Sequence, residues 1–311
     1  FDIESTFVDI NDQQAVADAI QENTKLVFCE SIGNPGLDVS NLPAIAKTAH
    51  AQGIPLVVDA TFATPYLNNP IDHGADVVVH SVTKWIGGHG AAVGGVVIDG
   101  GNFDWLKSGR FPTLTQPYEP FHGMNFWEEF GPAALAMRIR CESMRDIGAA
   151  MTPHNAFLLL QGLETLNLRM QQHVSNAKAM VSWLQEHDAV AWVNHPDIDA
   201  EAHTKALFPK GAVSMLTFGV KGGREAGAAF INALQLSSNL ANVGDSRTLV
   251  LHPGSTTHSR LSEADLLSAG ISADLIRVSV GIETLKDIQA DFNLGLRAAA
   301  KVVTNQTESQ V

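Results

Sequence analysis

The sequence predicts an α/β protein with a mostly parallel central sheet, and two observations lead to this prediction. Short apolar runs recur at 26–29, 56–59 and 77–79, the last two with several valines, as the buried strands of a parallel sheet do. Segments whose apolar residues have helical spacing, at 12–23 and 41–52, alternate with these runs. Strands that alternate with helices at this interval indicate crossover connections between parallel strands.

The rest of the chain predicts a helical bridge followed by a smaller domain. Residues 100–132 hold many aromatic and proline residues, which is typical of an ordered excursion because so many aromatic side chains are rarely left in solvent. From 132 to about 187 nearly every segment has helical character. We therefore predict a large domain at 1–163 and a small α+β domain at 164–311. Within the small domain we expect strands at 213–220, 248–251 and 275–280, helices at 223–235 and 284–300, and a frayed end at 304–311.

Charge and composition argue against several classes of partner. The 311 residues carry 20 Lys and Arg against 33 Asp and Glu, and this net charge of −13 argues against nucleic acid or an anionic membrane as the main partner. No apolar run approaches the roughly 18 residues that span a bilayer. Two cysteines are too few for a disulfide framework, so we expect a cytoplasmic protein.

The stretch His80–Gly90 places a lysine between hydroxyl residues and a glycine-rich turn. Lys84 follows a predicted strand, and open α/β sheets bind their ligands at the carboxyl ends of strands. Partial burial lowers the pKa of a lysine and makes its amine a nucleophile toward a carbonyl. The hydroxyls of Ser81 and Thr83 suit a phosphate. Together these residues suggest a Schiff base with pyridoxal phosphate. The alternatives are an ordinary surface lysine and an aldolase-type lysine that works without this cofactor.

Three other polar residues are expected to converge near Lys84. Asp59 ends a predicted strand, where its carboxylate could hold the protonated ring nitrogen of the cofactor. Asn34 follows another strand. Arg277 stands alone among apolar strand residues, and its planar guanidinium suits a carboxylate. Each residue also has a structural alternative, namely a helix cap for Asp59, a turn for Asn34 and an internal ion pair for Arg277.

Motifs for other chemistries are absent from the sequence. There is no G-x-x-x-x-G-K-[ST] and no G-x-G-x-x-G after a strand, so nucleotide binding is not indicated. No H-E-x-x-H and no paired C-x-x-C occurs, and the 12 histidines are scattered, which argues against a metal site. The G-x-S-x-G turn of serine hydrolases is absent too.

Taken together, the motifs resemble the Cys/Met-metabolism pyridoxal-phosphate enzymes, a family with the aspartate-aminotransferase-like fold (fold type I). The resemblance extends over essentially all 311 residues. The blocks that carry it are Glu30-Ser31-x-x-Asn34-Pro35, Val57-Val58-Asp59-x-Thr61-x-x-Thr64-Pro65, His80-Ser81-x-Thr83-Lys84-x-x-x-Gly88-His89, Gln161-Gly162-Leu163-Glu164-Thr165-Leu166, and His252-Pro253 with Ile276-Arg277-x-Ser279-x-Gly281-Ile282-Glu283.

The resemblance implies pyridoxal 5'-phosphate as the cofactor and assigns a role to each residue near it. Lys84 would form the Schiff base, and Asp59 would contact the pyridinium nitrogen. Ser81 and Thr83 would bind the phosphate. Asn34 would lie near the phenolic oxygen of the cofactor and the carboxylate of the substrate.

Within the family, the chain is most similar to the O-acetylhomoserine sulfhydrylase subgroup, through the insert at 102–112 and the run at 242–249. This similarity implies γ-replacement on O-acetyl-L-homoserine by sulfide or methanethiol, which gives homocysteine or methionine, with acetate, in methionine biosynthesis. Asn34, Thr248 and Arg277 would bind the substrate carboxylate. It also implies a homo-oligomer, a tetramer built as a dimer of dimers.

Several alternatives stay open at this point. A methionine or cystathionine γ-lyase and an O-succinylhomoserine sulfhydrylase are the nearest, although the lyases carry a Glu-Ser pair where this chain has Arg247-Thr248. Family members extend considerably further upstream, into a region that supplies the glycine-rich phosphate loop and the tyrosine stacked on the ring. We therefore expect weak cofactor retention and little activity from these 311 residues alone. The alternative of another class is an inactive oligomerisation or binding module.

Overall fold

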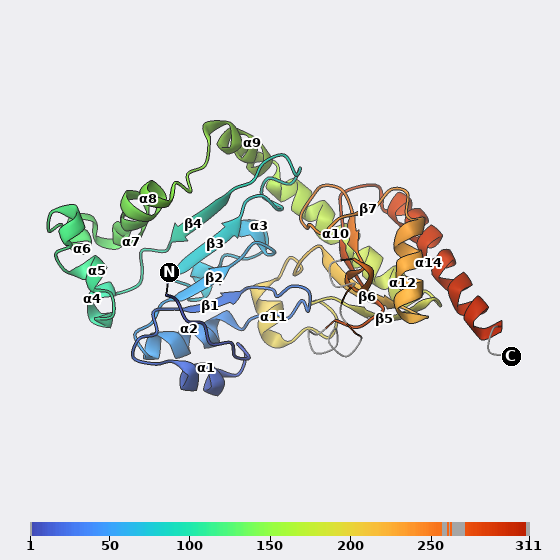
Figure 1. Cartoon of the computed structure of the whole chain (residues 1–311), viewed down its shortest axis with the longest axis horizontal. Coiled ribbons are helices and arrows are strands. Elements are labelled where there is room, and N and C mark those ends of the chain that lie inside the picture. Colours follow the sequence, from blue (N-terminus) through green and yellow to red (C-terminus); the bar gives the residue numbers. More distant parts are fainter. Residues whose placement is uncertain (1, 257–259, 261, 263–270, 309–311) are drawn as a thin grey trace. The chain divides into compact units, whose positions relative to one another are not determined.

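The computed structural model describes residues 2–256, 260, 262 and 271–308 of the chain (Figure 1). The chain forms two compact units, each with its own sheet. Neither unit is continuous in sequence. The longest segment of the second unit starts at Leu158, inside a long helix, and two earlier segments of the chain also belong to this unit. The predicted domain boundary at 163/164 stays a prediction. Unit 1 comprises Phe1–Ile32, Val39–Val82 and Val93–Phe157, and unit 2 comprises Gly33–Asp38, Thr83–Ala92 and Leu158–Val311.

Unit 1 contains a four-stranded sheet in the order β1-β2-β3-β4. The first three strands are parallel and the fourth is antiparallel to β3, which agrees with the predicted mostly parallel sheet. Because β2 and β3 are parallel, their last residues, Asp59 and Ser81, lie at the same edge of the sheet. The four strands are β1 (Val27–Glu30), β2 (Leu56–Asp59), β3 (Val77–Ser81) and β4 (Gly95–Asp99).

Two helices accompany the first strands, as predicted from the apolar spacing (Figure 1). Asp12 caps the first of them, because its carboxylate accepts hydrogen bonds from the N–H groups of Gln14 and Ala15. The second helix has a buried face made of residues at helical spacing. The early helices are α1 (Gln13–Ala19), α2 (Leu42–Ala51), α3 (Thr64–Leu67) and the 3₁₀ helix η1 (Pro70–His73).

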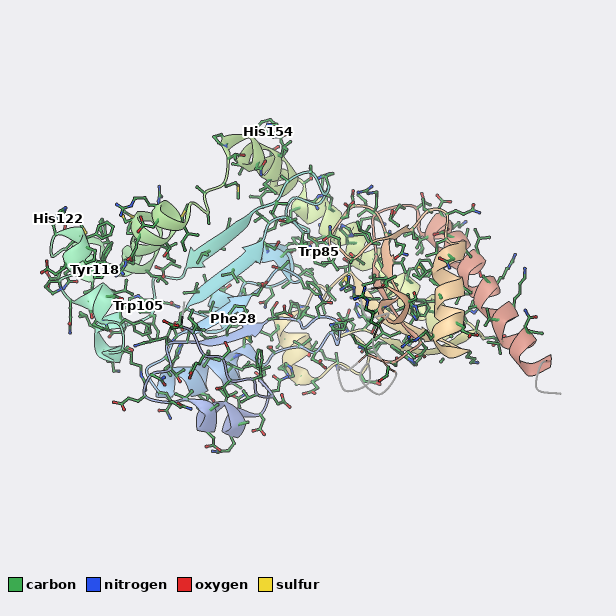
Figure 2. The ribbon with its side chains drawn as sticks, in the orientation of Figure 1. Phe28, Trp85, Trp105, Tyr118, His122 and His154 are labelled. Carbon is green, nitrogen blue, oxygen red and sulfur yellow. The ribbon has the colours of Figure 1, made fainter. Side chains whose placement is uncertain are left out.

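The aromatic excursion is ordered, as predicted, and this part of unit 1 forms a series of short helices. Phe103, Trp105 and Phe111 pack edge to face, with ring centroids 4.7 to 6.0 Å apart. Figure 2 shows Trp105 together with Tyr118 and His122 on this segment. Its elements are α4 (Trp105–Ser108), α5 (Pro112–Thr115), η2 (Glu119–Phe121), α6 (Phe126–Phe130), η3 (Gly131–Ala133), α7 (Ala134–Arg138), the π-helix η4 (Ile139–Met144) and α8 (Arg145–Ile147).

The helical run predicted from 132 to 187 is interrupted at 148–152 and again at Thr165. Gly148 ends α8 with a left-handed backbone (φ 76°), a conformation that glycine adopts without strain. The chain then resumes at Pro153, which suits the first turn of a helix. The two long helices that follow are α9 (Pro153–Glu164) and α10 (Leu166–Gln185).

Unit 2 contains a five-stranded mixed sheet in the order β5-β6-β9-β8-β7. Its core includes three mutually contacting rings, those of Phe218, Phe230 and Phe292, whose centroids lie 5.4 to 6.1 Å apart. Helices α12 and α14 run side by side next to this sheet (Figure 1). The elements are β5 (Val190–Asn194), α11 (Ala202–Leu207), β6 (Met215–Val220), α12 (Gly223–Ala233), β7 (Ser238–Asn239), β8 (Leu249–Leu251), η5 (Pro253–Ser255), β9 (Leu275–Ser279) and α14 (Leu285–Glu308).

Unit 2 also differs from the prediction in two respects. The elements β5, β7 and α11 were not predicted: β5 lacks a regular alternation of burial because its register shifts between Val190 and Trp192, and the other two are short. The frayed end predicted at 304–311 is wrong for residues 304–308, because α14 continues through them. Residues 309–311 lie outside the described part. None of the described helices is long and apolar enough to cross a membrane.

Candidate active site

In unit 1, a threonine links the two predicted cofactor residues. The carboxylate of Asp59 accepts a hydrogen bond from the Thr61 N–H at 2.8 Å, which forms a local turn after β2. The hydroxyl of Thr61 in turn accepts the N–H of Ser81 at 2.8 Å. Asp59, Thr61 and Ser81 are all half-buried. The ends of β2 and β3 are therefore joined at the sheet edge where open α/β sheets bind ligands.

A buried histidine lies beside this carboxylate. His80 precedes Ser81 in β3 and is only 4% exposed. Burial lowers its pKa, although the negative charge of Asp59 opposes this effect. The Nδ1 atom of His80 is buried without a hydrogen-bond partner among the described residues. The ring is therefore neutral at physiological pH. His80 does not place a positive charge next to the Asp59 carboxylate.

In unit 2, Lys84 lies in the turn that follows the transition between the two units at Val82–Thr83. Its amine donates a hydrogen bond to Oδ1 of Asn242, and its main-chain carbonyl accepts the N–H of Gly88 at 2.7 Å. Burial lowers the pKa of Lys84, and the positive charge of Arg277 lowers it further. Both effects increase the fraction of uncharged amine, the form that attacks a carbonyl.

Arg277 extends from β9 and contacts two amide groups rather than a carboxylate. One guanidinium nitrogen donates to Oδ1 of Asn34 at 3.1 Å, and another approaches the main-chain carbonyl of Asn242 at 3.4 Å. Arg277 forms no ion pair with any residue that the structure describes. The internal ion pair considered from the sequence is therefore not observed. The guanidinium can accept an external carboxylate without first breaking a salt bridge.

Thr248 occupies a different environment from the one expected of a substrate contact. Its side chain is fully buried, and its hydroxyl donates to the Glu283 carboxylate at 2.8 Å while accepting the Gly281 N–H at 3.0 Å. Its own N–H donates to Glu283 at 2.6 Å. A substrate contact by Thr248 stays a prediction, and it would require exchange of one of these bonds.

Thr83 is half-buried and belongs to the segment of unit 2 that contains Lys84, whereas Ser81 belongs to unit 1. The residues from His80 to Gly90 are contiguous, and the sequence therefore predicts a single block. The change of unit between Val82 and Thr83 has no obvious sequence signal. A phosphate contact from Thr83 stays a prediction.

Two residues near the predicted site were not assigned by sequence reasoning. Asn242 contacts Lys84 although 158 positions separate them, and no local pattern connects two residues so far apart. Thr61 lies two positions after Asp59, within a recognised block, but a threonine after a strand is equally typical of a turn. Unit 2 thus brings together Lys84, Asn242, Arg277 and Asn34.

The donor set has a defined chemical character. Unit 2 offers an amine with a lowered pKa and an arginine suited to a carboxylate, and unit 1 offers a carboxylate and a hydroxyl at one sheet edge. An aldehyde, a ring nitrogen and a phosphate are the groups that such residues bind, and pyridoxal phosphate carries all three. In the described ranges, no group of three or more His, Cys, Asp or Glu side chains is placed to hold a metal ion.

Comparisons with known proteins agree with this chemistry. Homocysteine synthase of Schizosaccharomyces pombe is 49% identical over 302 residues, which cover 96% of this chain and 70% of that protein. A crystal structure from Campylobacter jejuni that contains N'-pyridoxyl-lysine-5'-monophosphate has a TM-score of 0.86 at 36% identity and matches 93% of this chain and 70% of that one. The O-acetylhomoserine sulfhydrylase of the methionine biosynthetic pathway of Wolinella succinogenes has a TM-score of 0.79 at 38% identity, with 94% and 77% of the two chains covered.

The family assignment rests on the whole length of the match. The model of the Cys/Met metabolism PLP-dependent enzymes matches residues 1–297, and the solved relatives share the fold of this chain, as expected for fold type I. The residues that the family model covers include every candidate site residue described above. The chain belongs to the Cys/Met metabolism family of pyridoxal-phosphate-dependent enzymes.

Proposed function

We propose that this protein is an O-acetylhomoserine sulfhydrylase, which replaces the acetate of O-acetyl-L-homoserine by sulfide or methanethiol and so forms homocysteine or methionine. The observation that carries the proposal is the 49% identity to a homocysteine synthase across nearly the whole chain. Arg277 forms no ion pair with the described residues, and its charge lowers the pKa of Lys84, so a carboxylate-binding group lies near a reactive amine, which supports an amino acid as substrate.

Lys84, Asp59, Ser81, Thr83 and Asn34 are the residues that we propose to hold pyridoxal phosphate. Lys84 supplies the amine that binds the aldehyde covalently, and Asp59 supplies the negative charge that keeps the ring nitrogen protonated. Ser81 and Thr83 donate hydroxyl groups to the phosphate, and Asn34 contacts the phenolic oxygen. When bound, the cofactor would withdraw electrons from the carbon atoms of the substrate that lose protons.

Two further steps are proposed for the side chains of unit 2. Arg277 binds the substrate carboxylate through its planar fork, with Asn34 and Thr248 as additional contacts. Lys84, once its amine is free, accepts and returns protons at the substrate. The side-chain carbonyl of Asn242 accepts a hydrogen bond from that amine. Because an amide carbonyl only accepts hydrogen bonds and is a weak base, Asn242 orients the amine without taking its proton.

The assembly and the location follow from the resemblance to the family. We propose a homotetramer built as a dimer of dimers, and a cytoplasmic enzyme of methionine biosynthesis. A sedimentation experiment on the purified protein tests the assembly: a particle of four copies would support the proposal, and a monomer would contradict it.

The function is tested by supplying the purified protein with pyridoxal phosphate, O-acetyl-L-homoserine and sulfide, and by measuring homocysteine and acetate. Homocysteine formation that disappears in Lys84→Ala would support the proposal. Lys221→Ala, an exposed lysine of the same unit, is the matched control and should retain the activity.

The same assay separates the related activities. Faster turnover of O-succinyl-L-homoserine than of the acetyl ester would favour the succinyl-specific enzyme. Formation of 2-ketobutyrate as the main product would favour a γ-lyase. A protein that binds pyridoxal phosphate at Lys84 but turns over none of these substrates would contradict the proposed reaction while leaving the cofactor site in place.

A further inference from the structure

Arg169 of α10 is a buried arginine whose partners are neutral oxygen atoms. The residue is 6% exposed, and its guanidinium donates to the main-chain carbonyls of Trp85 at 2.6 Å, Gly162 at 2.6 Å and Ile86 at 3.0 Å. Its Nε atom also reaches the hydroxyl of Thr165 at 3.3 Å. Within the described part of the chain, Arg169 has no carboxylate partner.

A buried cation without a counter-charge is costly, so its position requires a physical reason. Burial lowers the pKa of Arg169, as it does for any cation removed from water. The carbonyls of Trp85 and Ile86 belong to a turn that is not paired in a sheet, and buried carbonyls without donors are themselves unfavourable. The third carbonyl, that of Gly162, also accepts the Thr165 N–H at 3.4 Å. A planar group with five N–H donors is the side chain best able to serve several such carbonyls at once.

Two of these carbonyls, those of Trp85 and Ile86, directly follow Lys84. The third belongs to Gly162 near the end of α9. Arg169 therefore fastens the turn that carries Lys84 to the junction of the two long helices. The hydrogen bonds hold main-chain atoms on the carboxyl side of the lysine, so they restrict the movement of the backbone that carries its side chain.

Two glycines make this contact possible. Gly88 has a left-handed backbone (φ +71°), and a Cβ atom there would lie 2.1 Å from a guanidinium nitrogen of Arg169. A Cβ atom on Gly162 would lie 2.4 Å from the carbonyl oxygen of Gly87. Both distances are far shorter than a real contact allows. The turn therefore packs against the guanidinium at Gly88 and directly against the helix backbone at Gly162.

Two further contacts hold other parts of the turn. The fully buried ring of Trp85 donates to the Ser214 hydroxyl at 2.8 Å, and the carbonyl of Gly88 accepts the Ser246 N–H at 2.8 Å. These contacts hold one side chain and the far end of the turn. The carbonyls adjoining Lys84 are held by Arg169.

We infer that Arg169 is a positioning residue for Lys84, which keeps the amine directed toward Asn242 and Arg277 by clamping the two carbonyls that follow it. The inference rests on the proposed role of Lys84 and is independent of the choice of thiol or acyl group. Arg169 acts through geometry, because Arg277 is the only cation whose charge is found to affect Lys84 among the described residues.

Loss of the contacts made by Arg169 should change the amine of Lys84 itself. If the clamp is lost, the turn becomes mobile and Lys84 spends more time in water and away from Arg277. Both changes raise its pKa and reduce its reactivity at neutral pH. A purely structural role would lower the thermal stability of the protein without moving the titration of Lys84.

The experiment compares Arg169→Met, Arg169→Lys and Phe292→Leu with the unaltered protein. Phe292 lies in the hydrophobic core of unit 2, so its variant provides a loss of stability without a change in the turn. Trace acetylation over a range of pH, read by peptide mass spectrometry, gives the pKa and reactivity of Lys84, with exposed Lys221 as the internal reference. Hydrogen exchange of the peptide containing residues 84–90 reports the mobility of the turn.

We expect Arg169→Met to speed hydrogen exchange in residues 84–90 about tenfold or more, since charge-assisted hydrogen bonds are lost, and to raise the pKa of Lys84 by about one unit. Arg169→Lys should recover part of both effects, because an ammonium can serve one or two of the carbonyls. Phe292→Leu should produce neither effect at a similar loss of stability.

Two outcomes would overturn the inference: unchanged exchange and titration in Arg169→Met, or equal changes in Phe292→Leu. Failure of the proposed function is recognised separately, by treating the unaltered protein with pyridoxal phosphate and borohydride. If no adduct forms at Lys84, the cofactor role of this lysine is wrong, and the acetylation and exchange measurements still decide whether Arg169 positions it.

Discussion

The amine of Lys84 and the side-chain carbonyl of Asn242 are joined by a hydrogen bond across 158 positions of the chain. The main-chain carbonyl of Asn242 faces the guanidinium of Arg277 at 3.4 Å. A single asparagine thus contacts both the proposed nucleophile and the proposed carboxylate-binding residue. Because its two carbonyls are neutral, it orients both cations without adding a charge that would oppose the lowered pKa of Lys84.

Replacing Asn242 by aspartate tests this neutrality. A carboxylate at hydrogen-bond distance favours the charged amine, so Asn242→Asp should raise the pKa of Lys84 by about one to two units. The change is measured as a shift of the pH midpoint for trace acetylation of Lys84. Asn305→Asp, at an exposed position of α14, is the control and should leave the midpoint unchanged. A midpoint that stays constant in Asn242→Asp would show that the hydrogen bond does not form in solution.

Arg277 should affect both the amine and the substrate. Its charge lowers the pKa of Lys84, so Arg277→Met should raise that pKa and leave less uncharged amine at neutral pH. Loss of a charge-assisted contact to the substrate carboxylate should also raise KM about tenfold or more. Arg277→Lys keeps the charge but not the planar fork, so it should preserve the pKa of Lys84 while still raising KM. Equal effects of both variants on the pKa would contradict an electrostatic role.

The parts of the fold with local sequence signals were predictable. The strand β2 was predicted at its observed bounds, Leu56–Asp59, because a β-branched run bounded by turn residues has few other interpretations. The convergence of Asp59 and Ser81 followed from the parallel order of their strands. The direction of the edge strand β4 was not predictable in this way, because a β-branched run does not specify that the strand pairs antiparallel with β3.

The parts of the site formed by distant contacts were not predictable. Asn242 contacts Lys84, and Arg169 contacts Trp85, through pairings that only the folded chain determines. Thr248 illustrates the converse. Its position in a family motif suggested a substrate contact, but nothing in the sequence indicated that Glu283 and Gly281 already occupy its hydroxyl. Whether a hydroxyl already has internal hydrogen-bond partners depends on the packing of the folded chain and cannot be read from a sequence pattern.

A buried histidine should make the protein sensitive to acid. His173 of α10 is fully buried, and because the Val280 carbonyl at 2.7 Å can only accept, its Nδ1 atom carries the proton. Its Nε2 atom has no partner among the described residues, and burial lowers the pKa of His173 to about 4. An unfolded histidine titrates near pH 6.5, so between pH 6.5 and 4 the unfolded chain binds a proton that the folded chain does not.

Stability should therefore fall as the pH falls through this window, by up to about 3 kcal/mol from His173 alone. The variant His173→Asn retains an N–H that can reach the Val280 carbonyl but cannot titrate. Urea denaturation at pH 7.5 and pH 4.5 should show a smaller loss of unfolding free energy for the variant than for the unaltered protein. Parallel losses in the two proteins would assign the acid sensitivity to other groups.

Thr61 provides the last test, in unit 1. Its N–H holds Asp59 and its hydroxyl accepts the N–H of Ser81, so Thr61→Val should keep the first bond and remove the second. A half-buried N–H without a partner would let the end of β3 move, and the affinity for pyridoxal phosphate should fall about tenfold. Thr61→Ser keeps the hydroxyl and should bind like the unaltered protein. The affinities are measured by absorbance titration.

If Thr61 acts by positioning the Ser81 hydroxyl, its effect depends on that hydroxyl. Thr61→Val should then cost less affinity in a Ser81→Ala background than in the unaltered protein, because the group that it positions is already missing. The two losses would instead add if Thr61 contacted the cofactor independently. A double-mutant cycle in the titration separates these cases, and an additive result would reject the link through Ser81 while leaving both residues as separate contributors to the site.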